Sequence, residues 1–590
     1  MPVTRLFDLL DRYCELYPDK EDALAAKQDG QWKKYSAKEL VSQAELVSYG
    51  LLAMGLQKGD KIATLSNNRP EWNFMDLGMM RAGAIHVPVY PTISTGDLKF
   101  ILNDAEVKYI FVSGQELWDK LEPLVSEMGG IRGMFSFDRL EGKPHWTDIT
   151  KEGKAHPDPG KIKAIGDSIG PNDLATLLYT SGTTGFPKGV MLSHDNILSQ
   201  LLAAQHLAPV DEHSKALSFL PLNHVYERVL SYLYMYKGVG IYYAESIEKV
   251  ADNLREVQPE IFGCVPRLFE KVYDRIMAKG SELRGIKKKL FFWAVDLGLK
   301  YELNGANGLV YEMKLKIARK LIFSKWQEAL GGKVKAAVSG GAALQPRLAR
   351  IFWAAQIPIL EGYGLTETSP VIAVNTLDPG GLKFGTVGKA IQKVTVRIAG
   401  DGEILCKGPN VMLGYYKRPD LTAEMIDAEG WLHTGDIGEL VDGVYLKITD
   451  RKKEIFKTSG GKYIVPQLIE NKLKESRFIE QVMVIGENRK FAAALVVPNF
   501  AFLREWCERK EIPLPASNNE LIAIERVKNR VMKEVNLVNE GLGSFESIKK
   551  IELLPREWSI DKGEMTPKLS LKRKVILELN KDLVDRIYAE

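Results

Sequence analysis

The chain has 590 residues, of which 45% are hydrophobic and 26% are charged, as expected for a soluble globular protein with about two to four domains. Its 80 lysines and arginines nearly balance its 76 aspartates and glutamates, and the net charge of +4 does not favour nucleic acid as a partner. No stretch has the apolar run of a signal peptide or a membrane span. The four cysteines lie far apart, without metal-binding or CxxC spacing, so we expect reduced thiols and a cytoplasmic location.

Short apolar segments alternate with helical patterns through the first 180 residues. We expect strands at residues 61–65, 84–89 and 107–112, and the same rhythm returns at 261–265 and 334–338. Such alternation predicts parallel sheets covered by helices, and hence an α/β fold. A strand-rich, turn-rich stretch follows from about residue 385 to 450, before a compact βα-like segment with a helical end. Residues 451–590 hold 27 basic and 21 acidic residues, which either attract an anionic co-substrate or form a solvated face.

The run from Tyr179 to Val190 reads Tyr-Thr-Ser-Gly-Thr-Thr-Gly-Phe-Pro-Lys-Gly-Val. Its glycines let the backbone approach a polyphosphate closely, its amide and hydroxyl groups can donate hydrogen bonds to anionic oxygens, and Lys188 adds a positive charge. The order of residues differs from the usual P-loop, in which Gly-Lys-Ser/Thr follows Gly and four residues. The alternative is an ordinary glycine- and threonine-rich surface turn.

Further segments follow this run in a fixed order. The sequence reads Leu-Pro-Leu-Asn-His-Val-Tyr-Glu-Arg at 220–228, Val-Ser-Gly-Gly-Ala-Ala-Leu at 338–344 and Glu-Gly-Tyr-Gly-Leu-Thr-Glu-Thr-Ser-Pro at 361–370. Together with the run above, they resemble the adenylate-forming (AMP-binding) superfamily, and most closely its long-chain fatty acyl-CoA synthetases. The resemblance implies a large N-terminal adenylation domain of parallel-sheet and barrel-like subdomains, at 1–450. A small mobile α+β domain would follow at 451–590, with a hinge near 450–453.

Residues 361–370 have a chemistry that suits this resemblance. Tyr363 can stack on an adenine ring, with Gly364 beside it leaving room. Thr366 offers a hydroxyl to the α-phosphate, and Glu367 is a hard oxygen ligand for a Mg²⁺ shared with ATP. The structural alternative is a strand–loop–helix connection in which Thr366 caps the helix and Glu367 lies in its first turn.

The resemblance assigns roles to residues of several further segments. In the phosphate loop they are Thr180 (a second Mg²⁺ ligand), Ser181, Gly182, Thr183, Thr184, Gly185 and Lys188. Gly340, Gly341 and Ala342 would let a base or an acyl group approach the backbone, unless they form only a tight turn. His224 would lie at the mouth of the acyl site, unless it is simply a packed core residue. The apolar stretch 229–243 would line the acyl tunnel.

The later segments would supply the ribose contacts, the hinge and the adenylation lysine. Asp436 suits the two ribose hydroxyls, Arg451 would contact ribose or phosphate, and Lys453 matches the hinge. Lys457, Gly460 and Gly461 would belong to the face used in thioester formation. Lys572 is the expected adenylation lysine, with Lys568 and Lys574 as rivals, because Lys568 stands where long-chain members have a small hydroxyl residue.

The implied reaction has two steps and uses ATP, Mg²⁺ and coenzyme A. A fatty-acid carboxylate attacks the α-phosphorus of ATP and releases pyrophosphate; the coenzyme A thiol then attacks the acyl adenylate and AMP leaves. A homodimer and peripheral contact with the inner face of a membrane are left open. So are three alternatives: a ligase that loads a carrier protein, an aryl- or medium-chain-specific ligase, and a non-catalytic acyl- or nucleotide-binding protein.

Residues 285–330 mix basic and aromatic residues and resemble an insertion of the long-chain subfamily. A helical stretch places Met313, Ile317, Leu321 and Ile322 near one face, among Lys314, Arg319, Lys320 and Lys325. We expect the apolar stripe to pack into the core and the lysines to face solvent, since this is the commoner arrangement. The alternative is contact with an anionic membrane surface.

Overall fold

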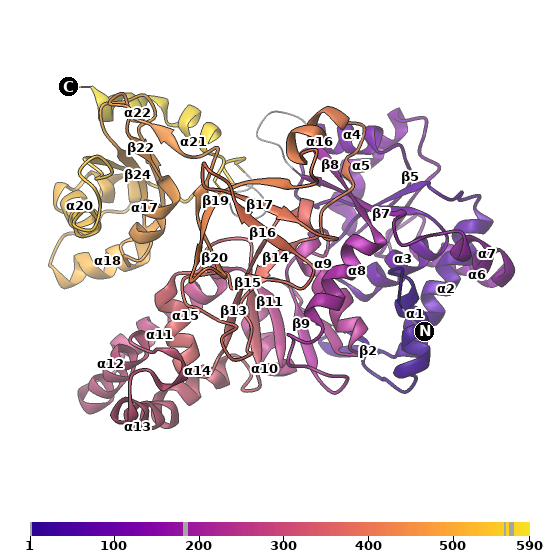
Figure 1. Ribbon diagram of the computed structural model, residues 1–590, viewed down its shortest axis with the longest axis horizontal. Helices are drawn as coiled ribbons and strands as arrows, with labels where there is room; N and C mark the ends of the chain where they lie inside the picture. Colours follow the sequence, from indigo (N-terminus) through magenta and orange to yellow (C-terminus); the bar gives the residue numbers. More distant parts are fainter. Residues whose placement is uncertain (1–2, 181–186, 560–561, 566–570, 590) are drawn as a thin grey trace. The chain divides into compact units, whose positions relative to one another are not determined.

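Strands and helices alternate along most of the chain in the computed structural model, which describes residues 3–180, 187–559, 562–565 and 571–589 (Figure 1). The chain forms two units. The first comprises Met1–Arg397, Leu405–His433 and Val441–Leu446, and the second comprises Ile398–Ile404, Thr434–Leu440 and Lys447–Glu590. The expected α/β class is therefore confirmed. The division at residue 450 and the hinge at 450–453 stay predictions.

A seven-stranded sheet organises the N-terminal part of the first unit. Its central strands β3, β4, β5 and β6 pair in parallel, and β7 joins β4 in parallel but pairs with β8 antiparallel. The predicted strands at 61–65 and 107–112 are observed with these bounds, and nearly all of their residues are buried, as expected for parallel strands that are covered on both faces. In spatial order the strands are β18 (Gly414–Tyr415), β8 (Lys188–Ser193), β7 (Leu174–Thr180), β4 (Ile85–Pro88), β3 (Lys61–Leu65), β5 (Val107–Val112) and β6 (Gly133–Ser136).

A nine-stranded sheet organises the rest of the first unit. Its interior strands pair in parallel, and antiparallel strands occur only towards its two edges. In spatial order the strands are β15 (Lys389–Ala390), β14 (Val371–Val374), β13 (Ile359–Gly364), β12 (Ala336–Ser339), β11 (Ile261–Cys264), β9 (Lys215–Ser218), β10 (Gly240–Tyr243), β1 (Leu24–Gln28) and β2 (Gln31–Tyr35).

The helices of the first unit connect these strands. The α-helices are α1 (Asp8–Leu16), α2 (Ala37–Ala53), α3 (Pro70–Arg81), α4 (Thr95–Asp104), α5 (Gly114–Glu127), α6 (Trp146–Ala155), α7 (Pro159–Asp167), α8 (His194–Ala204), α9 (Val225–Tyr236), α10 (Val250–Val257), α11 (Pro266–Glu282), α12 (Gly285–Leu299), α13 (Leu309–Ala318), α14 (Ser324–Ala329), α15 (Pro346–Ala354) and α16 (Pro419–Met425). Two 3₁₀ turns, η1 (Leu303–Gly305) and η3 (Thr366–Thr368), and a π-helical turn, η2 (Arg319–Phe323), complete the set.

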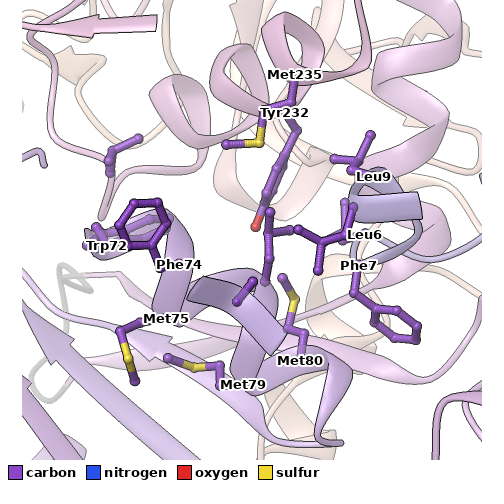
Figure 2. Close-up of a cluster of buried hydrophobic side chains, with 14 of the residues drawn as sticks. Leu6, Phe7, Leu9, Trp72, Phe74, Met75, Met79, Met80, Tyr232 and Met235 are labelled. Carbon is purple, nitrogen blue, oxygen red and sulfur yellow. The ribbon is translucent and has the colours of Figure 1, made fainter. Parts of the chain in front are cut away.

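Helix α3 lies in the middle of the largest apolar core. Its residues 70–80 are all buried, as expected for a helix that is surrounded by protein on every side. Figure 2 shows Trp72, Phe74, Met75, Met79 and Met80 of this helix together with side chains of α1 and of α9. The core therefore joins the N-terminal helix, α3 and α9 into one packed body.

A buried polar network lies within this apolar core. Arg228 of α9 donates to Asp76 of α3 at 2.6 Å, and its other nitrogens donate to Tyr232 and Thr176 at 2.8 Å. The Tyr232 hydroxyl donates to the second oxygen of Asp76 at 2.5 Å. His86 of β4 lies 2.5 Å from Asp76 through Nδ1, and burial together with Arg228 lowers its pKa to about 4, so the ring is neutral at pH 7.

The second unit contains smaller sheets and its own core. The strand-rich, turn-rich stretch expected from about residue 385 to 450 is observed as a four-stranded sheet whose residues are divided between the two units. Its strands are β16 (Thr395–Ile398), β17 (Glu403–Lys407), β19 (Leu432–Val441) and β20 (Tyr445–Arg451). The C-terminal strands are β21 (Phe456–Lys457), β22 (Tyr463–Ile464), β23 (Ile479–Ile485), β24 (Ala493–Pro498) and β25 (Lys550–Leu553). The helices are α17 (Pro466–Leu473), α18 (Phe500–Arg509), α19 (Asn518–Ala523), α20 (Glu525–Asn539), α21 (Arg573–Leu579) and α22 (Lys581–Tyr588).

The expectation for the basic, aromatic segment is wrong in one respect. Met313, Ile317 and Leu321 are exposed, whereas Leu315 and Phe323 are buried in an apolar cluster that also contains residues of α11, α12 and α15. The helix has apolar residues on both sides, so the spacing that placed the first three on one face did not identify the buried side. None of the helices in the described part of the chain has the length and apolar character needed to span a membrane.

The buried network predicts a contrast between two tyrosines of α9. Tyr232→Phe removes one hydroxyl that bonds both Arg228 and Asp76, so we expect the free energy of unfolding of the first unit to fall by about 1–3 kcal/mol. Tyr234 is equally buried, and its hydroxyl has no hydrogen-bond partner among the described residues. Tyr234→Phe should leave stability unchanged or raise it. Urea unfolding followed by tryptophan fluorescence measures both, and equal losses would contradict the network's role.

Candidate active site

The β7–β8 hairpin holds the two ends of the predicted phosphate loop. The ladder of the two strands continues as far as the pair Thr180 and Lys188, with Tyr179 opposite Gly189 one step further in. Ser181, Gly182, Thr183, Thr184 and Gly185 lie outside the described residues. The hairpin therefore places Thr180 and Lys188 side by side at the point where the loop leaves and rejoins the sheet.

Glu367 lies close to this hairpin. It is the middle residue of η3, a single 3₁₀ turn that follows β13, and its carbonyl accepts a hydrogen bond from the Met412 amide at 2.9 Å. Leu365, and not Thr366, occupies the N-cap position, so the alternative of a helix capped by Thr366 is wrong. Thr366 itself is buried at the same turn.

Tyr415 links the loop lysine to this carboxylate. Its hydroxyl donates to Oε1 of Glu367 at 2.9 Å, and Lys188 Nζ lies 5.3 Å from the centre of its ring. Burial raises the pKa of Tyr415, and the carboxylate of Glu367 raises it further, so the phenol remains a donor at neutral pH. The positive and negative groups expected to manage phosphate charge are thus brought to one place by a third side chain.

The sequence reasoning missed Tyr415. Its backbone belongs to β18, where it pairs with Val190, two residues after Lys188 on β8. The preceding Gly414 has φ of +134°, and a Cβ there would lie 2.8 Å from the side chain of Thr422, so only glycine fits. The one available signal was this glycine before two tyrosines, which is too common a pattern to identify a site.

The glycines of the second and third segments lie at the carboxyl ends of neighbouring parallel strands. Ser339 of β12 pairs with Glu361 of β13, so Gly340, Gly341 and Ala342 follow one strand while Tyr363 and Gly364 end the next. A Cβ at Gly364 would lie 1.6 Å from the Pro370 carbonyl oxygen, which excludes any side chain. Carboxyl ends of parallel strands are where α/β sheets commonly bind ligands.

His224 is the N-cap residue of α9. Its Nδ1 accepts a hydrogen bond from the Tyr226 amide at 3.0 Å, and its ring centre lies 6.5 Å from that of Tyr90. Tyr226 donates through its hydroxyl to the Val338 carbonyl of β12 at 2.8 Å, which fixes the start of α9 against the strand that leads to Gly340. His224 is partly exposed, so the alternative of a fully packed core histidine is wrong.

Two buried carboxyl groups lie behind these elements and were not singled out from the sequence. Burial raises the pKa of Glu227 on α9 and of Glu361 on β13 to about 8 each. Glu227 faces β11, where a Cβ at Gly263 would lie 3.0 Å from its Oε2. A hydrogen bond with Ser218 lowers the pKa of Glu227, but burial is the larger effect, so the side chain is held as a neutral acid at pH 7.

The second unit brings Asp436 and Arg451 together. Asp436 is buried on β19, and its Oδ1 lies 3.6 Å from Nε of the half-exposed Arg451 at the end of β20. The Lys452 amide donates to the Gly435 carbonyl at 2.8 Å, which holds the two strands in this register. Lys453 follows directly and is exposed.

The remaining predicted residues of the second unit form two further places. Lys457 Nζ lies 4.6 Å from the Tyr463 ring in the β21–β22 hairpin, whose tip contains Gly460 and, at φ of +75°, Gly461. Lys572 is the exposed N-cap residue of α21, and its amide donates to the Glu564 carbonyl at 2.8 Å. Lys574 is exposed on the same helix, and Lys568 lies outside the described residues.

The carboxylate of Glu367 suits Mg²⁺ rather than a metal with a full set of protein ligands. Within the described ranges no cluster of three or more His, Cys, Asp or Glu side chains could hold a metal ion. Mg²⁺ commonly binds through one or two carboxylates together with substrate phosphates. Oε1 of Glu367 accepts from Tyr415, and Oε2 accepts no hydrogen bond from a described residue.

Comparisons with known proteins cover the whole chain. Residues 10–416 match the family model for the AMP-binding enzyme, and residues 453–590 match that for the AMP-binding enzyme C-terminal domain. The chain is 33% identical to the long-chain-fatty-acid–CoA ligase FadD15 of Mycobacterium tuberculosis, over 95% of this chain and 93% of that one. It is 31% identical to human long-chain-fatty-acid–CoA ligase 1, over 100% and 87%.

Solved structures share the fold. The adenylation domain of a carboxylate reductase from Mycobacterium chelonae superposes with a TM-score of 0.79 at 21% identity, over 100% of this chain and 92% of that one. ATP-bound MatB from Rhodopseudomonas palustris superposes with a TM-score of 0.71 at 23% identity, over 98% and 99%.

The buried acid behind His224 predicts a pH-dependent effect of Glu227→Gln. The pKa of Glu227 in the folded protein, about 8, is above the ordinary value of 4.5, so folding favours the protonated form and stability is lost as pH rises from about 5 to about 8. Glutamine stays neutral. We expect similar unfolding free energies at pH 5.5, and a variant about 1–3 kcal/mol more stable than the parent at pH 8.5.

Urea unfolding at these two pH values measures the difference. Glu116→Gln, at an exposed position of α5, is the matched control and should change stability equally little at both pH values. A variant that is no more stable than the parent at pH 8.5 would contradict the buried, neutral state of Glu227.

Proposed function

The chain belongs to the AMP-binding enzyme family, and on this premise we propose that it is an ATP-dependent long-chain fatty acid–CoA ligase that works through an acyl adenylate. The observation that carries the proposal is the arrangement of Lys188, Tyr415 and Glu367 at the mouth of the β7–β8 hairpin, in a chain similar to such ligases along its whole length. In this proposal the cation of Lys188 and a carboxylate that would hold Mg²⁺ serve the predicted phosphate loop.

The first step needs alignment and charge management more than covalent chemistry. A fatty-acid carboxylate is ionised at pH 7 and can attack the α-phosphorus directly, so no general base is required. Lys188 would offset phosphate charge, and Glu367 with Thr180 would hold Mg²⁺, which supplies further positive charge to the phosphates when bound. Tyr363 and Thr366 would position the base and the α-phosphate, and His224 the acyl carboxylate.

The second unit would supply the groups that change between the two steps. Asp436 and Arg451 would hold the ribose, and the positive charge of Lys572 would offset the negative charge of the leaving pyrophosphate. Rotation near Lys453 would then withdraw Lys572 and bring Lys457, Gly460 and Gly461 towards the thioester step. The coenzyme A thiol attacks the acyl carbonyl, AMP leaves with the electron pair of the broken bond, and the thiol proton goes to solvent.

The partners of the reaction are small molecules: a carboxylic acid, ATP and coenzyme A. The further statements about partners and location belong to this proposal. They are a cytoplasmic location, peripheral contact with the inner face of a membrane, and a homodimer.

The first experiment measures pyrophosphate and AMP release from ATP across a series of saturated acids from acetate to long chains, with and without coenzyme A. We expect pyrophosphate release to be greatest with long-chain acids, and sustained turnover only when coenzyme A is present. Adenylation that ignores coenzyme A would instead support loading of a carrier protein. A peak with aryl or medium-chain acids would overturn the long-chain substrate, and no release with any acid would support a binding protein.

Tyr415→Phe should raise the Mg²⁺ requirement of the adenylation step. The variant keeps the ring beneath Lys188 but removes the hydroxyl that orients Glu367, and loss of such a supporting hydrogen bond typically weakens metal binding by about tenfold or more. Pyrophosphate release titrated with Mg²⁺ measures the shift, while the KM for the fatty acid should stay unchanged. Tyr416→Phe is the control, because its hydroxyl makes no hydrogen bond to a described residue. An unchanged Mg²⁺ titration in Tyr415→Phe would refute the role.

A further inference from the structure

Helix α13 and the π-helical turn after it carry apolar side chains on two opposite sides. On the inner side, Leu315, Ala318 and Phe323 are buried with α12 and α15. Figure 1 shows α11 to α14 grouped together at one edge of the first unit. The outer side chains form what we call the α13 face, and they are between 46% and 85% exposed: Leu309, Val310, Met313, Ile317 and Leu321.

The α13 face is contiguous rather than scattered. Leu309, Met313, Ile317 and Leu321 follow one another at intervals of four residues, which places them in one row along the helix. Single exposed apolar side chains are ordinary on protein surfaces, but a continuous row of large ones marks a surface that is covered in use. Ile286, at the start of α12 in the same helical group, is 83% exposed.

The charge around the α13 face is mainly positive, although Glu312 lies on the same helix. Lys314, Lys316 and Lys320 are exposed on the same stretch and, among the described residues, make no ion pair. Residues 284–325 hold ten lysines and arginines against three aspartates and glutamates, a net charge of +7 in a chain whose total is +4. Exposed Lys287, Lys288 and Lys289 add to this at the start of α12. The partner of this surface must therefore be both apolar and anionic.

We propose that the α13 face docks on a lipid bilayer that contains anionic phospholipids. The five apolar side chains would enter the boundary between headgroups and acyl chains, and the neighbouring lysines would contact the phosphates. The proposal deepens the proposed function, on which it rests, because a long-chain acid dissolves in such a bilayer. The docked helix would bring the enzyme to its substrate.

Two other occupants fit the α13 face less well. A second copy of the chain in a two-fold dimer would bring two surfaces of net charge +7 against each other, which costs electrostatic free energy. Nucleic acid would satisfy the lysines, but its phosphate backbone offers nothing to five exposed apolar side chains. A bilayer with anionic headgroups matches both properties of the surface.

Sedimentation of the full chain with phospholipid vesicles tests the proposal. We expect the parent protein to bind vesicles of phosphatidylcholine with phosphatidylglycerol, and to bind phosphatidylcholine alone far more weakly. Lys314→Glu/Lys316→Glu/Lys320→Glu should lower the partition coefficient about a hundredfold. Met313→Ser/Ile317→Ser/Leu321→Ser should lower it about tenfold or more, since these side chains are exposed and their loss leaves the core intact.

The matched control reverses three exposed lysines elsewhere, in Lys154→Glu/Lys161→Glu/Lys333→Glu, and should reduce binding much less. Equal effects of the two charge variants, or no binding by the parent, would overturn the proposal. A dimer that Met313→Ser/Ile317→Ser/Leu321→Ser dissolves would assign the face to a second copy and overturn it too. Pyrophosphate release with vesicle-free fatty acid should be unchanged in all variants, so loss of docking and failure of the proposed activity are distinguishable.

Discussion

An arginine without access to water decides how the first unit is assembled. Arg228 is tolerated in the core because its charge and its nitrogens have partners: Asp76 neutralises it, and Tyr232 and Thr176 accept hydrogen bonds from it. Its guanidinium carbon also lies 5.4 Å from the centre of the Trp72 ring. These partners come from α3, β7 and α9, so the three elements must pack in one relative position for Arg228 to reach all of its partners. The charge pair fixes α9 against α3, and the hydrogen bond to Thr176 fixes it against β7 of the seven-stranded sheet. Tyr226 at the start of the same helix bonds to β12 of the nine-stranded sheet.

This constraint extends to the candidate site because α9 begins at His224. The histidine, the neutral acid Glu227 and the tyrosine that touches β12 are held by the same helix that carries Arg228. Packing one polar network correctly therefore orients several groups at the proposed acyl site. Helices α1, α3 and α9 pack together mainly through buried apolar side chains (Figure 2). The polar contacts then favour one arrangement of these helices over others.

The sequence predicted those features that depend on local pattern. The strands at 61–65 and 107–112 and the α/β class follow from short apolar segments that alternate with helical patterns. The roles of the loop lysine and of Glu367 stay predictions that rest on a resemblance carried by short motifs. Contacts between distant segments were not predictable in this way. Tyr415 lies 48 residues from Glu367 and Asp76 lies 152 from Arg228. Helix α13 has apolar residues on both sides, so its sequence does not indicate which side is buried. Packing against the neighbouring helices buries Leu315 and Phe323 and leaves Met313 and Ile317 exposed.

The position of Tyr415 has a consequence for the protein before any nucleotide arrives. A lysine and a glutamate that are proposed to serve the same ligand would be expected to form an ion pair with each other when that ligand is absent. An ion pair at about 4 Å is worth roughly 1–4 kcal/mol near a protein surface, and a ligand would have to break it on entry. In the described part of the chain no ion pair joins Lys188 to Glu367. Instead, Lys188 lies over the ring of Tyr415, and the hydroxyl of Tyr415 donates a hydrogen bond to Glu367. Tyr415 thus separates the two opposite charges, so that neither has to be released from an ion pair before it can bind a ligand.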